Sequence, residues 1–178
     1  MKTMNFEIEV KAPLKDLDAF VRKLREEGAQ LLEEMVFEDN LLFDTPDREL
    51  YRKGQALRLR KRGNRSWITF KGRRIKDDRF KIREEVETEV AGFEEMALIL
   101  EKLGFKKSFR YQKFTAKYLL EGTLISVDRT PIGNYVEIEG DRERVLRVAK
   151  RLGLEEQEFI KKDYIALTRE KGLKEMVF

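Results

Sequence analysis

Hydrophobic and polar side chains alternate along several short segments of the chain, a pattern typical of β-strands whose two faces differ. In residues 6–11 the apolar side chains of Phe6, Ile8 and Val10 alternate with charged ones. Segments with a strand signal lie at about residues 4–12, 29–44, 55–62, 65–72, 79–91, 105–121, 123–130 and 135–139. Turn signals such as Gly63-Asn64 and Glu121-Gly122 separate some of them, which predicts antiparallel hairpins.

Other segments repeat apolar residues at helical spacing. After Pro13, the residues Leu17, Phe20 and Leu24 recur on one face of a predicted helix that ends near Gly28. Further helices are expected at about residues 93–103, 141–152 and 161–171, with a short one between the turn at 45–47 and the glycine at 54. Residues 72–78 are polar and basic, so a mobile loop is expected there.

Eight strand-like segments with mostly short connections predict a closed or nearly closed antiparallel sheet with helices on its outside. The fold class is therefore α+β, and residues 1–178 are expected to form one domain. The helices need apolar surface to cover, which places the charged strand faces inside the barrel. The alternative is an open sheet whose charged faces meet solvent.

Composition narrows the chemistry. The chain has 38 Lys and Arg, 34 Asp and Glu, and neither cysteine nor histidine. Disulfides, zinc sites built on Cys or His, and mechanisms with a histidine base are excluded. We expect neither a signal peptide nor an apolar run long enough to span a membrane, which predicts a cytoplasmic protein.

The charges are unevenly distributed along the chain. Residues 52–83 contain 14 Lys and Arg against only Asp77 and Asp78, whereas residues 84–101 contain seven Glu and no basic residue. Such segregation predicts a strongly anionic ligand near the basic segment. The basic stretch 72–81 also raises the alternative of contact with RNA or DNA, although most loops of this kind are simply solvated.

Residues 7–11 carry the first candidate site. Glu7, Glu9 and Lys11 share one strand face, where side chains two apart lie roughly 6.5–7 Å from each other. This row could seat a divalent cation and the phosphate that accompanies it, or it could be an ordinary half-solvated strand. Neither a phosphate-binding loop with a Gly-Lys pair nor a Gly-x-Gly-x-x-Gly motif occurs, so side chains would have to hold any phosphate.

Taken together, the charged motifs resemble those of the CYTH proteins, the triphosphate tunnel enzymes. The resemblance covers nearly the whole chain, in the family's order. Its elements are Glu7-x-Glu9-x-Lys11, Asn40-Leu-Leu-Phe-Asp44-Thr45-Pro46, Leu57-Arg58-Leu59-Arg60, Thr69-Phe70-Lys71, Arg83-x-Glu85-x-Glu87, Val127-Asp128, Gly133 and Val136-Glu137-Ile138-Glu139.

The resemblance implies an eight-stranded antiparallel barrel that forms a tunnel for a triphosphate, with Mg²⁺ or Mn²⁺ as cofactor. The implied metal ligands are Glu7, Glu9, Glu137 and Glu139. The implied triphosphate contacts are Lys11, Arg58, Arg60, Lys71, Arg83, Arg110 and Lys113, and the implied catalytic residues are Glu9, Lys11 and Lys71. Glu85, Glu87 and Asp128 would either hold these cations in place or contact a second metal. Carboxylates suit hard divalent cations, and Arg and Lys suit phosphate.

One strand departs from the family's pattern. The family has a Lys-x-Arg pair on the strand before the Asp strand, and here the candidates are Arg110 and Lys113. Their opposite parity means that both can face the tunnel only across a bulge. The residue two after Lys113 is Thr115 rather than Arg, which puts this contact in question.

Length and layout are most similar to the class IV adenylyl cyclase branch, which converts ATP to cyclic AMP and pyrophosphate. A triphosphatase acting on tripolyphosphate, thiamine triphosphate or a nucleoside triphosphate is the alternative reaction. A non-catalytic barrel that binds polyphosphate, nucleotide or RNA is an alternative of another class. The resemblance also implies a homodimer, and the lack of a long apolar run predicts no membrane contact.

Overall fold

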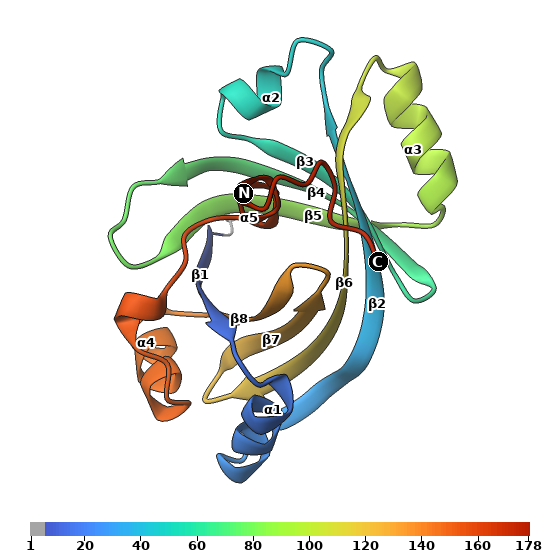
Figure 1. Ribbon diagram of the computed structural model, residues 1–178. Helices are drawn as coiled ribbons and strands as arrows, with labels where there is room; N and C mark the ends of the chain where they lie inside the picture. Colours follow the sequence, from blue (N-terminus) through green and yellow to red (C-terminus); the bar gives the residue numbers. More distant parts are fainter. Residues whose placement is uncertain (1–5) are drawn as a thin grey trace, which may run out of the picture.

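Eight antiparallel strands close into a barrel in the computed structural model, which describes residues 6–178 (Figure 1). The strands are β1 (Phe6–Leu14), β2 (Gln30–Asp44), β3 (Ala56–Arg62), β4 (Arg65–Ile75), β5 (Lys81–Val90), β6 (Lys106–Leu120), β7 (Thr123–Thr130) and β8 (Gly133–Glu139). Their order around the barrel is β1-β5-β4-β3-β2-β6-β7-β8. The predicted fold class is confirmed.

The first strand closes the barrel by pairing with two strands that are distant in sequence. Its first half pairs with β5, and its second half pairs with β8. The register sets Glu9 opposite Glu139 and Lys11 opposite Glu137. Carboxylates from the two ends of the chain are therefore neighbours on one face of the sheet.

Helices cover the outside of the barrel with apolar faces, as the alternation predicts. Figure 1 shows α1 (Leu17–Glu26) and α4 (Arg142–Arg151) beside β7 and β8, and α3 (Phe93–Lys102) on another side. The largest apolar cluster joins Leu24 of α1 and Val145 of α4 to strand residues such as Val127 and Ile138, all fully buried. A smaller cluster packs Leu100 of α3 against β2 and β3. With the outer faces apolar, the charged faces point inward.

The C-terminal part of the chain lies across one end of the barrel. After a short 3₁₀ turn at Glu156–Glu158, helix α5 (Tyr164–Glu170) packs Tyr164 and Leu167 against aromatic residues of β6 and β8. The last residues then run beside β6, where the amide of Gln112 donates a hydrogen bond to the carbonyl of Met176. Met176 is fully buried, so this tail is part of the fold.

Two segments differ from the sequence prediction. Strand β4 continues through Ile75 across a bulge after Lys71, because Arg74 and Ile75 pair with β5, so the loop predicted at 72–78 is wrong in its first half. The last helix begins at Tyr164 rather than at residue 161, because Asp163 caps it by accepting a hydrogen bond from the amide of Ala166. Residues 4 and 5 of the first predicted strand lie outside the described residues.

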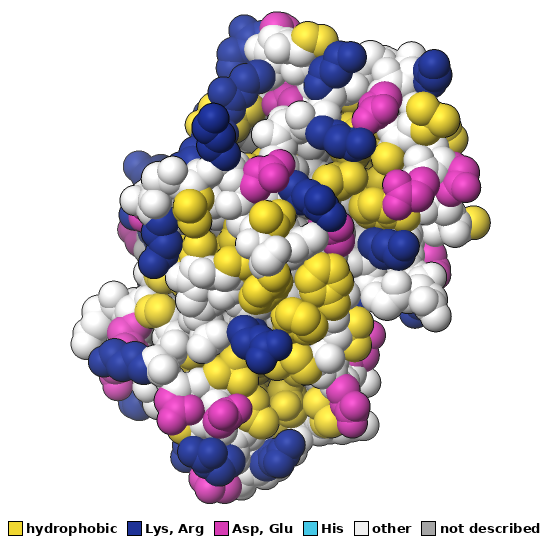
Figure 2. Space-filling model, turned by 45° about the vertical axis from the view of Figure 1, so that its right-hand side comes forward, with side chains coloured by type: hydrophobic (Ala, Val, Ile, Leu, Met, Phe, Trp, Pro, Cys, Tyr) yellow, Lys and Arg dark blue, Asp and Glu magenta, His cyan; other side chains and the backbone are white. Residues whose placement is uncertain are grey.

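Figure 2 looks onto the side of the barrel where β2, β6 and the C-terminus lie, and hydrophobic side chains gather there. Phe37 packs against Phe114 with ring centroids 5.2 Å apart, and Phe114 packs against Phe178 at the same distance. Among residues 6–178, no helix combines the length and the apolar character needed to cross a membrane.

Candidate active site

The charged strand faces enclose a tunnel with a cavity of about 560 Å³. Among residues 6–178, acidic and basic side chains line it in equal number: Glu7, Glu9, Glu38, Glu85, Glu87, Glu137, Glu139 and Asp163 against Lys11, Arg58, Arg60, Lys71, Lys81, Arg83, Lys113 and Lys117. The prediction that the charged faces point inward is confirmed, and the open-sheet alternative is wrong. A small enclosed space with charges of both signs requires extensive pairing or a charged ligand.

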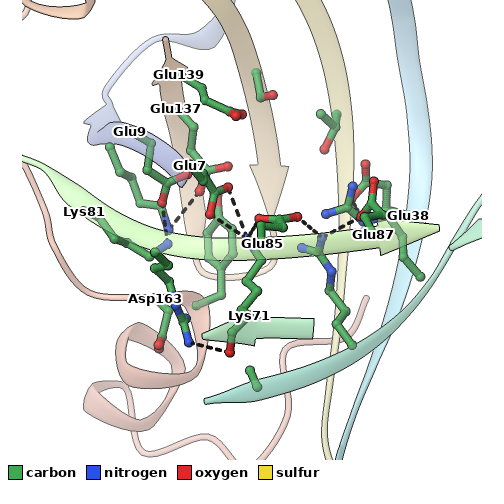
Figure 3. Close-up of a pocket in the computed structure, with 18 of the residues that line it drawn as sticks. Glu7, Glu9, Glu38, Lys71, Lys81, Glu85, Glu87, Glu137, Glu139 and Asp163 are labelled. Atoms are coloured by element: carbon green, nitrogen blue, oxygen red, sulfur yellow. Dashed lines mark hydrogen bonds and ion pairs between the residues drawn. The ribbon is translucent and has the colours of Figure 1, made fainter. Parts of the chain in front are cut away.

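Lysines neutralise most carboxylates at the β1 side of the tunnel. The Lys71 ammonium lies 2.9 Å from Glu7, the Lys11 ammonium lies 3.0 Å from Glu137, and Lys81 pairs with Glu9. Figure 3 shows Glu7, Glu9, Glu137 and Glu139 gathered on one side of the cavity, above Lys71 and Lys81. Three strands, β1, β5 and β8, supply this cluster together with Lys71 of β4.

Glu139 is the exception in this cluster. None of the residues 6–178 places a Lys or Arg nitrogen within 4.0 Å of its carboxylate. Burial and the nearby carboxylates of Glu7 and Glu9 raise the pKa of Glu139 to about 7. This corner of the tunnel therefore carries excess negative charge and favours the arrival of a cation.

The donor set at this corner fits a divalent cation. Four carboxylates, from Glu7, Glu9, Glu137 and Glu139, supply only oxygen, which Mg²⁺ and Mn²⁺ prefer. In the described part of the chain, however, no three acidic side chains already converge on one point as metal ligands. A cation would have to take carboxylate oxygens away from the lysines that now hold them. The metal therefore stays a prediction.

Arginine and lysine occupy the middle of the tunnel. The Arg58 guanidinium, which is buried, donates hydrogen bonds to Thr69 and Glu87 and lies 3.6 Å from Glu85. Burial opposes the charge of Arg58, but Tyr111 and these two carboxylates raise its pKa. Glu85 also lies 2.7 Å from Lys71. The structure thus places Glu85 and Glu87 where the sequence predicted, beside the cations that they would support.

A second charge cluster lies deeper, around Glu38 of β2. This carboxylate is 1% exposed and lies 3.3 Å from Arg62, 3.6 Å from Arg60 and 3.8 Å from Lys113. Although burial alone would raise its pKa, these cations lower the pKa of Glu38 to about 2. One Glu38 oxygen and two Arg62 nitrogens have no hydrogen-bond partner in the described structure. Such buried orphan atoms are typical of a site completed by water or ligand.

Lys113 and Arg110 point in opposite directions, so one predicted contact needs correction. The Lys113 ammonium is buried in the tunnel and donates a 2.7 Å hydrogen bond to Asp128. Arg110 lies on the outer surface, where it donates hydrogen bonds of 2.6 and 2.9 Å to Asp39. Strand alternation runs through this segment without the bulge that would have turned both inward. Arg110 therefore cannot contact a ligand in the tunnel.

Arg83 reaches the tunnel wall, but its nitrogens are used differently from those of Arg58. It donates hydrogen bonds to the backbone carbonyls of Gly72 at 2.9 Å and Gly54 at 3.0 Å. Burial, with the nearby Arg74 adding to it, lowers the pKa of Arg83. Its side chain thus fixes the bulge of β4 and leaves a buried positive charge close to the tunnel.

Several tunnel residues were missed by sequence reasoning. The structure adds Glu38, Arg62, Lys81, Tyr111, Lys117 and Tyr164 to the buried or tunnel-lining polar residues. Lys81 could have been found, because it has the same parity as Arg83 and Glu85 on β5. Glu38 was hidden because its inward row also contains Leu42, which weakens the alternation of β2.

Asp128 links the tunnel to helix α5. Its two oxygens accept hydrogen bonds from Lys113 at 2.7 Å, Thr115 at 2.7 Å and the Tyr164 hydroxyl at 2.6 Å. The Tyr164 ring also lies under the Lys11 ammonium, 3.9 Å from ring centroid to nitrogen. Helix α5 therefore sets the position of two tunnel lysines that the sequence assigned to the triphosphate.

We expect Tyr164→Phe to lower the free energy of unfolding by about 1.5–3 kcal/mol, the usual worth of a buried hydrogen bond to a charged group. Asp128 is fully buried, so it would lose a donor that water cannot easily replace. Urea denaturation measures the change. Tyr118→Phe is the matched control, because the buried Tyr118 ring makes no side-chain hydrogen bond within the described chain. Equal effects of the two substitutions would contradict this role of Tyr164.

The closed barrel, with a tunnel lined by both acidic and basic side chains, defines the class of protein. A comparison of the sequence with known families agrees with this assignment. A family profile for the CYTH domain matches residues 5–164. The chain belongs to the CYTH domain family.

Individual relatives cover nearly the whole chain. A protein of Methanocaldococcus jannaschii, named as a candidate adenylate cyclase, is 28% identical over 172 residues, which is 90% of this chain and 97% of the relative. The X-ray structure of a candidate adenylate cyclase from Vibrio parahaemolyticus gives a TM-score of 0.83 at 21% identity, over 94% of this chain and 99% of that one. The structure of a candidate adenylyl cyclase from Hippeastrum, described as having a dominant triphosphatase activity, gives a TM-score of 0.69 at 21% identity, over 94% of this chain and 96% of that one.

Proposed function

We propose that this protein is a divalent-metal-dependent enzyme that holds a nucleoside or inorganic triphosphate in the tunnel and breaks one of its phosphoanhydride bonds. The observation that carries the proposal is the placement of lysines and arginines from five different strands in one enclosed space with a carboxylate cluster. Within residues 6–178, pairing of these charges with one another leaves Glu139 without a basic partner and Nε of Arg58 without a hydrogen-bond acceptor. In a metal–triphosphate complex, the metal would supply positive charge to the carboxylates, and the triphosphate would supply negative charge to the lysines and arginines.

Each group of residues has a distinct part in the proposed mechanism. Lys11, Arg58, Arg60, Lys71 and Lys113 bind phosphate oxygens, with Lys81 added from the structure. Arginine binds two oxygens at once and fixes orientation, whereas lysine acts as a point charge. Glu85, Glu87 and Asp128 hold these cations in place. Phosphoryl transfer depends mainly on such positioning and on neutralising negative charge.

The carboxylates of Glu7, Glu9, Glu137 and Glu139 would hold Mg²⁺ or Mn²⁺ next to the phosphate-binding lysines. When bound, the metal supplies positive charge to phosphate oxygens and makes phosphorus more electrophilic. Glu9 and Lys11 lie on the same strand face as this cluster, and Lys71 spans Glu7 and Glu85. We therefore keep Glu9, Lys11 and Lys71 as the residues nearest to the proposed reaction.

Two reactions fit this arrangement. In the first, the 3′-hydroxyl oxygen of ATP attacks the α-phosphorus, the bond from that phosphorus to the bridging oxygen breaks, and pyrophosphate leaves with cyclic AMP as the other product. In the second, water attacks the terminal phosphorus of a triphosphate, the bond from that phosphorus to the bridging oxygen breaks, and orthophosphate and the diphosphate are released, with the protons of the attacking water passing to the products or to solvent. We place cyclisation first because the Methanocaldococcus relative carries that name, and hydrolysis second because of the Hippeastrum protein.

A single incubation panel tests the proposal. ATP, thiamine triphosphate and tripolyphosphate are each offered with Mg²⁺, with Mn²⁺ and with a chelator, and the products are identified. Cyclic AMP and pyrophosphate from ATP would support the cyclase, whereas orthophosphate from tripolyphosphate would support the triphosphatase. Absence of turnover of all three compounds with both metals would contradict the enzyme and leave a binding protein.

A further inference from the structure

A second cavity of about 560 Å³ lies next to the tunnel, between α2 (Glu49–Arg52), the β4 bulge and α5. Leu42, Ala56, Arg83, Asp163 and Ile165 line both spaces, so one wall separates them. We call this second space the arginine chamber, because Arg48, Arg52, Arg73, Arg74, Arg83 and Arg169 line it.

The arginine chamber has a surplus of positive charge that the tunnel does not have. In the part of the chain that the structure describes, its six arginines face only two acidic side chains, Asp44 and Asp163. Asp44 is occupied by the backbone, since it accepts hydrogen bonds from the amides of Thr45, Leu50 and Tyr51. Asp163 pairs with Arg74 at 2.6 Å and caps α5. Little negative charge is left for the other arginines.

Most of these arginines have no acidic partner. Arg52 pairs with Asp47 at 2.7 Å, outside the chamber lining. Within residues 6–178, no carboxylate oxygen lies within 4.0 Å of Arg48, Arg73, Arg83 or Arg169. Arg83 is only 6% exposed, and a buried cation without a counter-charge is costly to the fold. The other five arginines are exposed and bring their charges to the same space, and such a concentration of positive charge attracts an anionic ligand.

The shape of the cluster selects the kind of anion. The guanidinium groups of Arg48 and Arg169 both lie over the Tyr51 ring, 4.5 and 5.5 Å from its centroid. Guanidinium groups match the tetrahedral oxygens of phosphate, each giving two parallel hydrogen bonds. Both acidic side chains of the described lining are already engaged, so the chamber has no free carboxylate to bind a metal ion. It therefore suits a phosphate group that carries no metal.

We propose that the arginine chamber is a second phosphate-binding site beside the tunnel. Its ligand is either the further phosphate groups of a linear polyphosphate longer than three or a free phosphate ion. This inference rests on the proposed triphosphate-binding function, because the shared wall makes the two sites neighbours. It would let the protein distinguish a triphosphate from longer chains.

Calorimetric titration of the full chain, with a chelator present to prevent turnover, separates the two ideas. Tripolyphosphate, a longer linear polyphosphate and inorganic phosphate are titrated separately into the wild type and into Arg73→Ala/Arg169→Ala. We expect the double variant to lose about tenfold or more in affinity for the longer chain or for inorganic phosphate, with tripolyphosphate binding unchanged. A loss confined to the longer chain identifies a polyphosphate tail, and a loss for inorganic phosphate identifies the free ion.

The matched control is Arg22→Ala/Arg25→Ala on α1, which removes the same charge from exposed positions. Figure 1 shows α1 at the opposite end of the molecule from α2. If both double variants behave alike toward all three compounds, the second site is overturned. If the wild type, titrated again with Mg²⁺ or Mn²⁺ in place of the chelator, also fails to bind tripolyphosphate, the proposed function falls, while the inorganic phosphate titration still tests the arginine chamber by itself.

Discussion

Glu139→Gln is expected to reduce turnover of the preferred triphosphate by about 100-fold or more, without lowering the stability of the fold. Glu139 belongs to the proposed metal-binding carboxylates, and an amide oxygen is a much weaker ligand for a hard cation than a carboxylate. The substitution leaves no lysine without its partner, because Glu139 has none within ion-pair distance in the described structure. It also removes a like charge from beside Glu7 and Glu9.

This separation of activity from stability is unusual within the carboxylate cluster. Glu9→Gln would also lower turnover, but it would leave Lys81, whose side chain is mostly buried, without its partner and destabilise the protein as well. Steady-state kinetics with metal and thermal unfolding in a chelator measure the two effects. Glu34→Gln, an exposed position on β2, is the control for the loss of one negative charge. Turnover of Glu139→Gln within a few-fold of wild type would exclude Glu139 from the metal site.

Glu38→Gln is expected to lower the free energy of unfolding at neutral pH by about 3 kcal/mol, the energy that corresponds to lowering a pKa from 4.5 to about 2. The amide keeps the shape of the side chain but withdraws a carboxylate that lies within 4.0 Å of both Arg60 and Arg62. Removing one partner of a buried charge cluster leaves the others without compensation.

The pH dependence of this effect has a definite sign. Because the folded-state pKa of Glu38 is below its unfolded value, its contribution is complete above about pH 4.5 and disappears as the pH falls toward about 2. The stability gap between wild type and Glu38→Gln should therefore be constant near neutral pH and shrink in acid. Urea denaturation at a series of pH values measures the gap. Glu34→Gln again serves as the control, and a gap of the same size at every pH would contradict the charge mechanism.

The sequence predicted the barrel because apolar and charged residues alternate along each strand that has one apolar face and one charged face. Leu57 and Leu59 face α3, while Arg58 and Arg60 face the tunnel, as their parity requires. The same parity rule, applied two residues before Arg83, would have assigned Lys81 to the tunnel as well. It also separates Lys113 from Arg110, since the two differ by an odd number of positions and no bulge intervenes.

What the sequence could not reveal depends on contacts between distant segments. No local pattern places Tyr164 beside Asp128, because that hydrogen bond joins residues 36 positions apart through the packing of α5. The bulge in β4 was missed because Arg73 and Arg74 read as loop, whereas pairing of Ile75 with Ile82 continues the strand. The arginine chamber likewise forms only when α2, β4 and α5 meet.

The equal numbers of acidic and basic side chains around the tunnel have a consequence for how ligands enter it. Lys71 and Lys81 already hold Glu7 and Glu9, so a cation alone must displace lysines, and an anion alone must displace carboxylates. When a cation and an anion bind together, the cation takes the place of the lysines beside the carboxylates, and the anion takes the place of the carboxylates beside the lysines. Metal and phosphate should therefore each raise the affinity for the other, and by linkage the two enhancements must be equal.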